Sequence, residues 1–96
     1  MRFNAIILIL LAPSIEAAEN SFENGNLAFA RGEYENAITE YRKILDTNRT
    51  SAALHHNLAN AYFELARAQL DDLPGDLTGL GRAIYHYRIA RQIEPR

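Results

Sequence analysis

The sequence contains no cysteine, so the chain has no disulfide framework, no thiolate zinc site, no thiol nucleophile and no attachment point for a bacterial lipoprotein anchor. It also lacks a surplus of positive charge. Its 10 lysine and arginine residues are scattered among 12 aspartate and glutamate residues, which gives a net charge of -2. Without a basic patch, nucleic acid and anionic membrane surfaces are not expected as partners.

Signatures of catalysis are missing as well. The sequence has no G-x-S-x-G, no phosphate-binding glycine loop and no convergent pair of carboxylates. We therefore expect a protein that is not an enzyme, takes no cofactor and has no small-molecule substrate. What is present instead is an apolar composition, 48% hydrophobic over 96 residues, which is typical of one soluble globular unit.

The first seventeen residues differ from the rest. A single basic residue, Arg2, precedes the apolar run from Ala5 to Ala12, Pro13 breaks this run, and small residues follow. The run is too short to cross a bilayer as a helix, which needs about 20 residues. This order predicts a secretory signal peptide over residues 1–17, removed after Ala17. The alternatives are an N-terminal helix that packs on the domain and an uncleaved anchor.

Two segments of the remaining chain align at a shift of 34 residues, Glu19 to Gly32 with Ala53 to Ala66, so that Asn26 matches Asn60. Two further segments, GEYENAITEYRKIL and GLGRAIYHYRIARQI, align at a shift of 46 and repeat an Ala-Ile pair and a tyrosine. Each segment carries apolar residues at helical spacing, so the sequence predicts an all-α fold of two helix pairs. Because the two shifts differ by twelve, the second pair contains about twelve extra residues around 67–79.

A period near 34 residues built from two helices resembles the tetratricopeptide repeat (TPR) family. The resemblance implies helix-turn-helix repeats stacked as a segment of an α-solenoid, with repeat one over residues 18–51 and repeat two over residues 52–96. Small residues are expected where the two helices of each repeat cross, with Gly25 facing Ala37 in repeat one and Ala59 facing Ala83 in repeat two. Tyr41 and Tyr87 are expected to cover the groove between helices. The packing positions are Gly25, Ala37, Tyr41, Ala59, Ala83 and Tyr87.

The connections follow from local signals. Gly32 is expected to end the first helix in a left-handed conformation, and Pro95 to stop the last one. The third helix is predicted to reach about Leu70, and the fourth to restart with Asp76 as N-cap after a turn at Pro74 and Gly75.

The segments NLANAYFELA and LGRAIYHYRIARQIEP, which follow the predicted signal peptide, also resemble the TPR proteins of bacterial aerotolerance (Bat) operons. This resemblance implies export, to the periplasm or to the outer side of the inner membrane, and a role as an interaction module in an envelope assembly.

In TPR proteins a partner segment enters a groove lined by the first helix of each repeat. That face is expected to carry Phe22, Asn26, Phe29, His56, Asn60, Phe63 and Glu64. Stacked asparagine amides could bind the backbone of an extended peptide, and the phenylalanines its side chains. The alternative is that the asparagines are merely tolerated at a solvated surface and that the phenylalanines belong to the core.

A metal site is not predicted. His55 and His56 point about 100° apart on a helix, and no second ligand stands three or four residues from either of them. Packing or groove lining explains both histidines better. The acidic residues near Asp72 lack the ligand spacing of a calcium loop.

Two repeats are few for a stable solenoid, and the last helix would leave Ile89, Ala90 and Ile93 partly bare. Two functions follow from the sequence. The first is a module that binds a protein or peptide in the groove. The second is a structural or oligomerising subunit of an envelope complex that associates, with itself or with a partner, through the exposed last helix.

Overall fold

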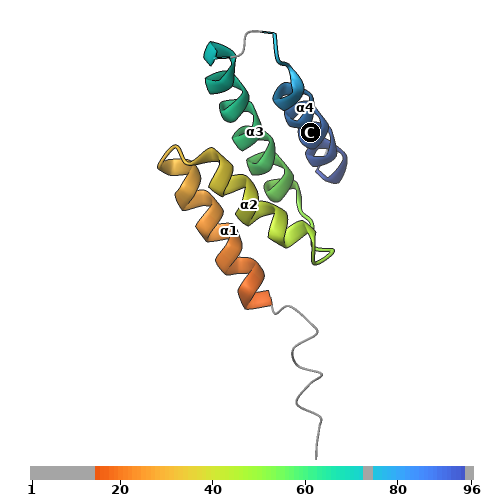
Figure 1. Cartoon of the computed structure of the whole chain (residues 1–96). Coiled ribbons are helices and arrows are strands. Elements are labelled where there is room, and N and C mark those ends of the chain that lie inside the picture. Colours follow the sequence, from red (N-terminus) through yellow and green to blue (C-terminus); the bar gives the residue numbers. More distant parts are fainter. Residues whose placement is uncertain (1–14, 73–74, 95–96) are drawn as a thin grey trace, which may run out of the picture.

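The computed structural model describes residues 15–72 and 75–94, and these form four helices without a strand (Figure 1). The helices are α1 (Ile15–Ala30), α2 (Tyr34–Leu45), α3 (Ala52–Asp72) and α4 (Thr78–Ile93). Each lies within a segment whose apolar spacing predicts a helix. The expected all-α fold is therefore confirmed for the described part of the chain.

The helix ends follow from specific residues. Gly32 has a φ of +78° just past α1, as expected for a left-handed residue that lets the chain reverse into α2. Asn48 has a φ of +63° in the link between α2 and α3, a conformation that asparagine tolerates better than most residues. Ser51 then caps α3, because its hydroxyl oxygen accepts a hydrogen bond from the backbone N–H of Leu54 at 3.0 Å.

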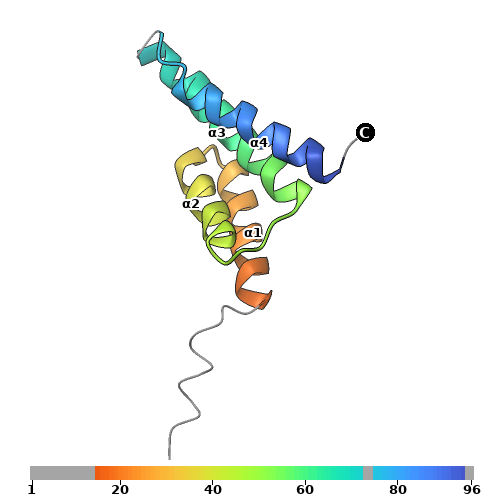
Figure 2. The ribbon, with the colours of Figure 1, turned by 90° about the vertical axis from the view of Figure 1, so that its right-hand side faces the viewer.

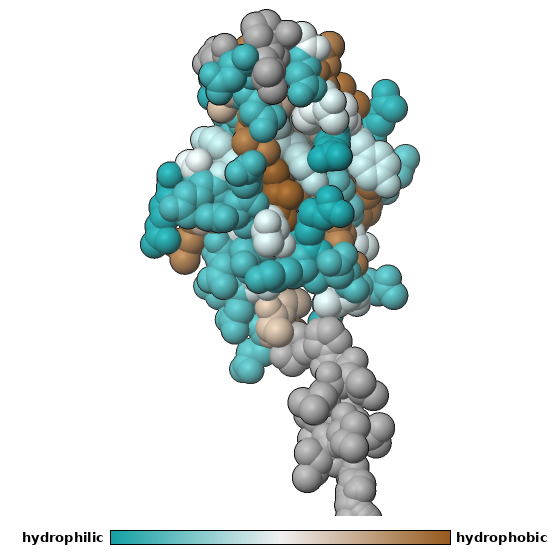
Figure 3. Space-filling model, in the orientation of Figure 1, coloured by the Kyte–Doolittle hydropathy of each residue, from teal (hydrophilic) through white to brown (hydrophobic). Residues whose placement is uncertain are grey.

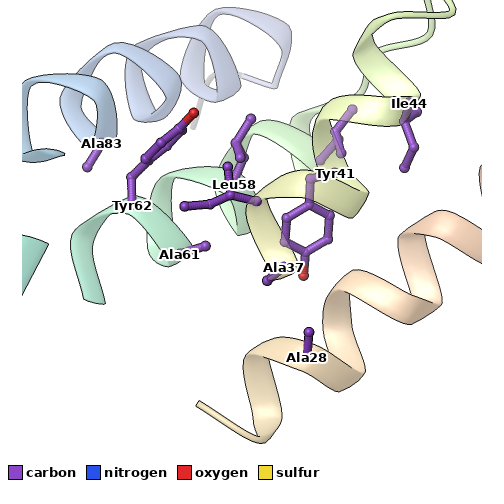
Figure 4. Packing of buried hydrophobic residues seen from close by; sticks show 10 residues of the cluster. Ala28, Ala37, Tyr41, Ile44, Leu58, Ala61, Tyr62 and Ala83 are labelled. Atoms are coloured by element: carbon purple, nitrogen blue, oxygen red, sulfur yellow. The ribbon is translucent and has the colours of Figure 1, made fainter. Parts of the chain in front are cut away.

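The four helices form two antiparallel pairs, α1 with α2 and α3 with α4, joined through packing of α2 against α3 (Figures 1 and 2). In the close view, Tyr41 of α2 points toward α1, and Tyr62 of α3 lies next to Ala83 of α4 (Figure 4). Tyr41 is only 1% exposed. The buried cluster comprises Ala28, Ala37, Ile38, Tyr41, Ile44, Leu54, Leu58, Ala61, Tyr62 and Ala83.

The four small residues expected at the helix crossings, Gly25, Ala37, Ala59 and Ala83, are all buried. The detail at Gly25 differs from the expectation that it faces Ala37. A Cβ atom at Gly25 would lie 2.4 Å from the Cε1 atom of Tyr41, so the glycine makes room for the aromatic ring. Tyr41 is therefore a core residue as much as a cover for the groove.

The extra residues of the second repeat lengthen α3, which continues to Asp72 instead of ending near Leu70. The helix α4 begins at Thr78, with Leu77 in the N-cap position in place of the predicted Asp76. Asp76 still contributes, because its carboxylate accepts a hydrogen bond from the backbone N–H of Thr78 at 3.1 Å. Gly75 has a φ of +96°, which fits the predicted turn. Pro74 and Pro95 lie outside the described residues.

The predicted signal peptide falls mainly on residues 1–14, which are also outside the described part. Its last three residues form the start of α1, so cleavage after Ala17 would shorten that helix. Within residues 15–72 and 75–94, no helix combines the length and the apolar character that a membrane span requires. In the space-filling view, hydrophilic side chains cover most of one face, and apolar side chains surface between them (Figure 3).

Candidate functional site

A hollow of about 220 Å³ lies where α1, α2 and α3 meet. Its lining residues are Asn26, Phe29, Tyr41, Asn57 and Asn60. Three of the predicted groove residues, Asn26, Phe29 and Asn60, are thus brought together from α1 and α3 by the fold. Phe29 is half-buried and meets the ring of Tyr34 edge-on, with the ring centroids 5.2 Å apart.

The side chain of Asn26 is held in a defined orientation. Its Oδ1 atom accepts a hydrogen bond of 2.5 Å from the hydroxyl of Tyr41 and another of 3.1 Å from Nδ2 of Asn57. An amide has one carbonyl oxygen and one NH₂ group with two donors. Because both internal donors use the oxygen, the NH₂ group of Asn26 remains available to a ligand.

The second repeat contains the same arrangement. The hydroxyl of Tyr87 in α4 donates a hydrogen bond to Oδ1 of Asn60 in α3. Burial raises the pKa of both Tyr41 and Tyr87, so each hydroxyl keeps its proton at neutral pH and acts as the donor. The fold therefore presents two asparagine NH₂ groups, one from each repeat, with their oxygens tied to tyrosines.

The other predicted groove residues lie elsewhere. Phe22 lines a different hollow of about 550 Å³, where α1 meets Ile44 and the start of α3. His56 lines a third hollow, of about 700 Å³, between α3 and α4. Phe63 is 40% exposed on α3 and does not line the small hollow. Glu64 accepts a hydrogen bond of 2.6 Å from Arg67 on the same helix.

Asn57 is a residue of the hollow that the sequence does not indicate. It stands one helical turn before Asn60, but its repeat equivalent is Glu23, so the repeat gives no signal for it. The pairing of each tyrosine with an asparagine is also not predicted. It could have been inferred, since Asn26 recurs as Asn60 at the shift of 34 residues and Tyr41 recurs as Tyr87 at the shift of 46.

His55 is buried and belongs to a second polar cluster. Its Nδ1 atom lies 2.9 Å from Nδ1 of His86, and its Nε2 atom lies 2.6 Å from Oγ1 of Thr50. The two imidazole planes are 23° apart, with ring centroids separated by 5.1 Å, so the rings meet edge to edge. One proton is shared between the two Nδ1 atoms, which requires at least one of the histidines to be neutral.

The surroundings of His86 favour the neutral form. Burial, together with the nearby His55 and Arg42, lowers the pKa of His86 to about 4. Burial also lowers the pKa of His55. The partner of His55 is 31 residues away on α4, which is why a search over three or four residues misses it. Within the described ranges, no group of three or more potential metal ligands is present.

Comparison with known families gives a match to part of the chain. Residues 25–65 match the family described as TPR repeat. The matched segment begins within α1, includes all of α2 and ends within α3, so it spans the junction of the two predicted repeats. Neither the curated proteins nor the solved structures contain a significant match to this chain. Nothing in the comparisons therefore supports the resemblance to aerotolerance-operon proteins.

The match supports the TPR interpretation for this part of the chain. Repeats of this kind generally mediate protein–protein interaction and typically have no catalytic role of their own.

Proposed function

We propose that this protein is a non-catalytic interaction module that binds an extended protein segment in the groove between α1 and α3. One observation supports the proposal above the others: Asn26 and Asn60, equivalent residues of the two repeats, each have the side-chain oxygen occupied by a tyrosine hydroxyl. Each amide nitrogen is thereby left as a fixed donor, and such donors suit the carbonyl groups of an extended backbone.

Apolar side chains would supply the remaining contacts. Phe29 lines the hollow next to Asn26, and Phe63 is exposed three residues beyond Asn60 on α3. Because the amides are held before the partner arrives, little side-chain entropy is lost on binding. Sequence preference of the groove is expected to come from apolar partner side chains that meet Phe29 and Phe63.

We further propose that the module acts outside the bacterial cytoplasm, in the periplasm or on the outer side of the inner membrane. The support is the sequence of residues 1–17, with its basic start, short apolar run and small residues before the proposed cleavage point. A fusion of residues 1–30 to a periplasm-dependent reporter would test this, since export predicts reporter activity and cytoplasmic retention predicts none.

Selection from a randomised peptide library displayed on phage tests the groove. Peptides retained by the wild-type chain should bind the double variant Asn26→Ala and Asn60→Ala at least about tenfold more weakly, because each removes a fixed donor. Asn24→Ala is the matched control, since Asn24 is an exposed asparagine of α1 that does not line the hollow. Peptides that bind the double variant as tightly as the wild type would refute the groove.

A second candidate function is that of a structural subunit that associates through α4, with itself or within an envelope complex. It is favoured by the exposure of Ile84 at 52% and Tyr85 at 61%. The expectation that Ala90 is partly bare is wrong, because α3 buries it, whereas Ile93 is 42% exposed and Ile89 is half-buried. Ile84→Glu should abolish such association and leave groove binding intact.

A further inference from the structure

The helices α2 and α4 are repeat equivalents with different neighbours. α2 packs against α1 and α3, whereas α4 packs only against α3 among the described elements and lies at the edge of the molecule (Figure 1). Ile38 of α2 is 9% exposed, but its equivalent Ile84 in α4 is 52% exposed. Ile84 therefore lies on the face of α4 that corresponds to the α3-covered face of α2.

The hollow of about 550 Å³ that Phe22 lines and the hollow of about 700 Å³ that His56 lines occupy equivalent positions in the two repeats. We call them the first and the second hollow. In the first, Leu54 at the start of α3 lies opposite Ile44 and is buried. The second, of about 700 Å³, is lined by residues of α3 and α4 that include Ala52, His56, Tyr87 and Ala90. Ala52 and Ala90 are the repeat equivalents of Ala18 and Ile44, which line the first hollow. The second hollow is thus the place where the start of a further helix would pack.

The charge of this face defines the partner more closely. Arg88 and Arg91 follow Ile84 by four and seven residues, so all three share one side of α4. Both arginines are exposed, and neither forms an ion pair with a residue of the described part. In α2 the equivalent of Arg88 is Arg42, which donates a hydrogen bond of 3.2 Å to the hydroxyl of Tyr62 on the covering helix.

The α1 helix of a second copy fits this face poorly. At the positions of the buried Leu54 and Leu58 of α3, α1 has Asn20 and Asn24. At the position of Leu65 it has Arg31. Leu65 lines a hollow with residues 32–36 at the start of α2, whose equivalents at the start of α4 include Arg82, so Arg31 would approach another arginine there. End-to-end stacking of identical chains would therefore bury polar groups without partners, which is unfavourable.

We propose that the α4 face around Ile84, together with the adjoining hollow, binds an amphipathic helix of another protein. The helix carries apolar residues at the spacing of Leu54, Leu58, Ala61 and Leu65, and an acidic residue at the position of Tyr62, within reach of Arg88. This inference rests on the second function proposed above and is independent of the groove.

The test uses a fluorescein-labelled synthetic peptide of residues 52–68 carrying Tyr62→Glu, titrated with the full chain and followed by anisotropy. A comparison peptide also carries Leu54→Asn and Leu58→Asn, the residues that α1 has at these positions. We expect saturable binding of the first peptide and none of the second. Ile84→Glu in the chain should weaken binding at least about tenfold, because it places a charged carboxylate in the apolar part of the interface, where it can pair with Arg88 in place of the peptide's acidic residue. Leu27→Glu, at an exposed leucine of α1, is the matched control and should change nothing.

Three results would overturn the inference. The first is the absence of binding, or equal binding to Ile84→Glu. The second is loss of binding in the variant Asn26→Ala and Asn60→Ala, which would locate the peptide in the groove and support the first function instead. The third is a concentration-dependent dimer in sedimentation that Ile84→Glu dissociates, which would make a second copy the occupant of this face.

Discussion

The hydroxyl of Tyr41 on α2 donates a hydrogen bond of 2.5 Å to Oδ1 of Asn26 on α1. This bond joins the two helices of the first repeat and also sets the direction of the asparagine amide. Tyr87 and Asn60 repeat it in the second helix pair. One contact therefore contributes both to the packing of each pair and to the surface that a partner would meet.

Removing a single hydroxyl tests the structural half of this contact. Tyr87→Phe should lower the free energy of unfolding by about 0.5–1.5 kcal/mol, the usual net contribution of one hydrogen bond. Urea unfolding followed by circular dichroism measures the change. Tyr85→Phe is the control, because Tyr85 is 61% exposed and its hydroxyl forms no hydrogen bond with a described residue. A loss of stability as large in the control would contradict the assignment.

Two glycines of α4 should respond in opposite ways to substitution by alanine. A Cβ atom at Gly79 would lie 2.7 Å from Cβ of Ala66, whereas nothing lies within 4 Å of a Cβ atom at Gly81. Gly79→Ala should destabilise the fold by about 1–2 kcal/mol, since overpacking outweighs the gain in helix propensity. Gly81→Ala should stabilise it by up to about 1 kcal/mol. Thermal unfolding of both variants measures the two changes in stability. A stabilisation by both substitutions would show that α3 and α4 do not approach closely at Gly79.

The His55–His86 pair predicts a loss of stability in mild acid. The pKa of His86 in the folded chain is about 4, below its ordinary value of 6.5, so the unfolded chain binds a proton more readily as the pH falls. The stabilisation is complete above pH 6.5 and is lost progressively between pH 6.5 and about 4. Denaturant midpoints measured at pH 7.5 and pH 4.5 should therefore differ.

His86→Asn provides the comparison for the pH experiment. An asparagine amide can still exchange a hydrogen bond with Nδ1 of His55, but it does not titrate in this range. The variant should lose less stability than the wild type between the two pH values. Arg42 and His55 also face His86. The arginine stays charged over this range, but His55 is itself titratable and burial lowers its pKa, so part of the dependence will remain. An identical loss in both proteins would show that another group is responsible.

Much of the fold could be predicted, because the spacing of apolar residues indicates the helices and the small residues indicate where the helices cross. The repeated Ala-Ile pair and tyrosine identify α2 and α4 as equivalent helices, and Gly32 marks the end of the first helix. The start of α4 was harder to predict. Asp76 is a good N-cap residue, but it bonds to Thr78 from one position before the helix boundary.

Less of the site could be predicted, because it depends on contacts between distant residues. The amides of Asn26 and Asn60 follow the repeat, whereas Asn57 has no repeat equivalent of its kind. His86 cannot be recognised from the sequence as a partner of His55, because only the packing of α4 on α3 brings the two together. Phe22 lies one turn before Asn26 on the same face of α1, and at that level of the helix it lines the hollow that contains Ile44 and Leu54.

The affinity of a library-selected peptide for the double variant Asn26→Asp and Asn60→Asp tests the proposed groove most directly. Aspartate keeps the oxygen that accepts from Tyr41 and Tyr87 but removes the NH₂ donors, so folding is retained while the partner loses its hydrogen bonds. We predict an unchanged helical circular dichroism spectrum and an affinity at least about tenfold weaker. Wild-type affinity in this variant would contradict the proposal that the two amides bind the partner.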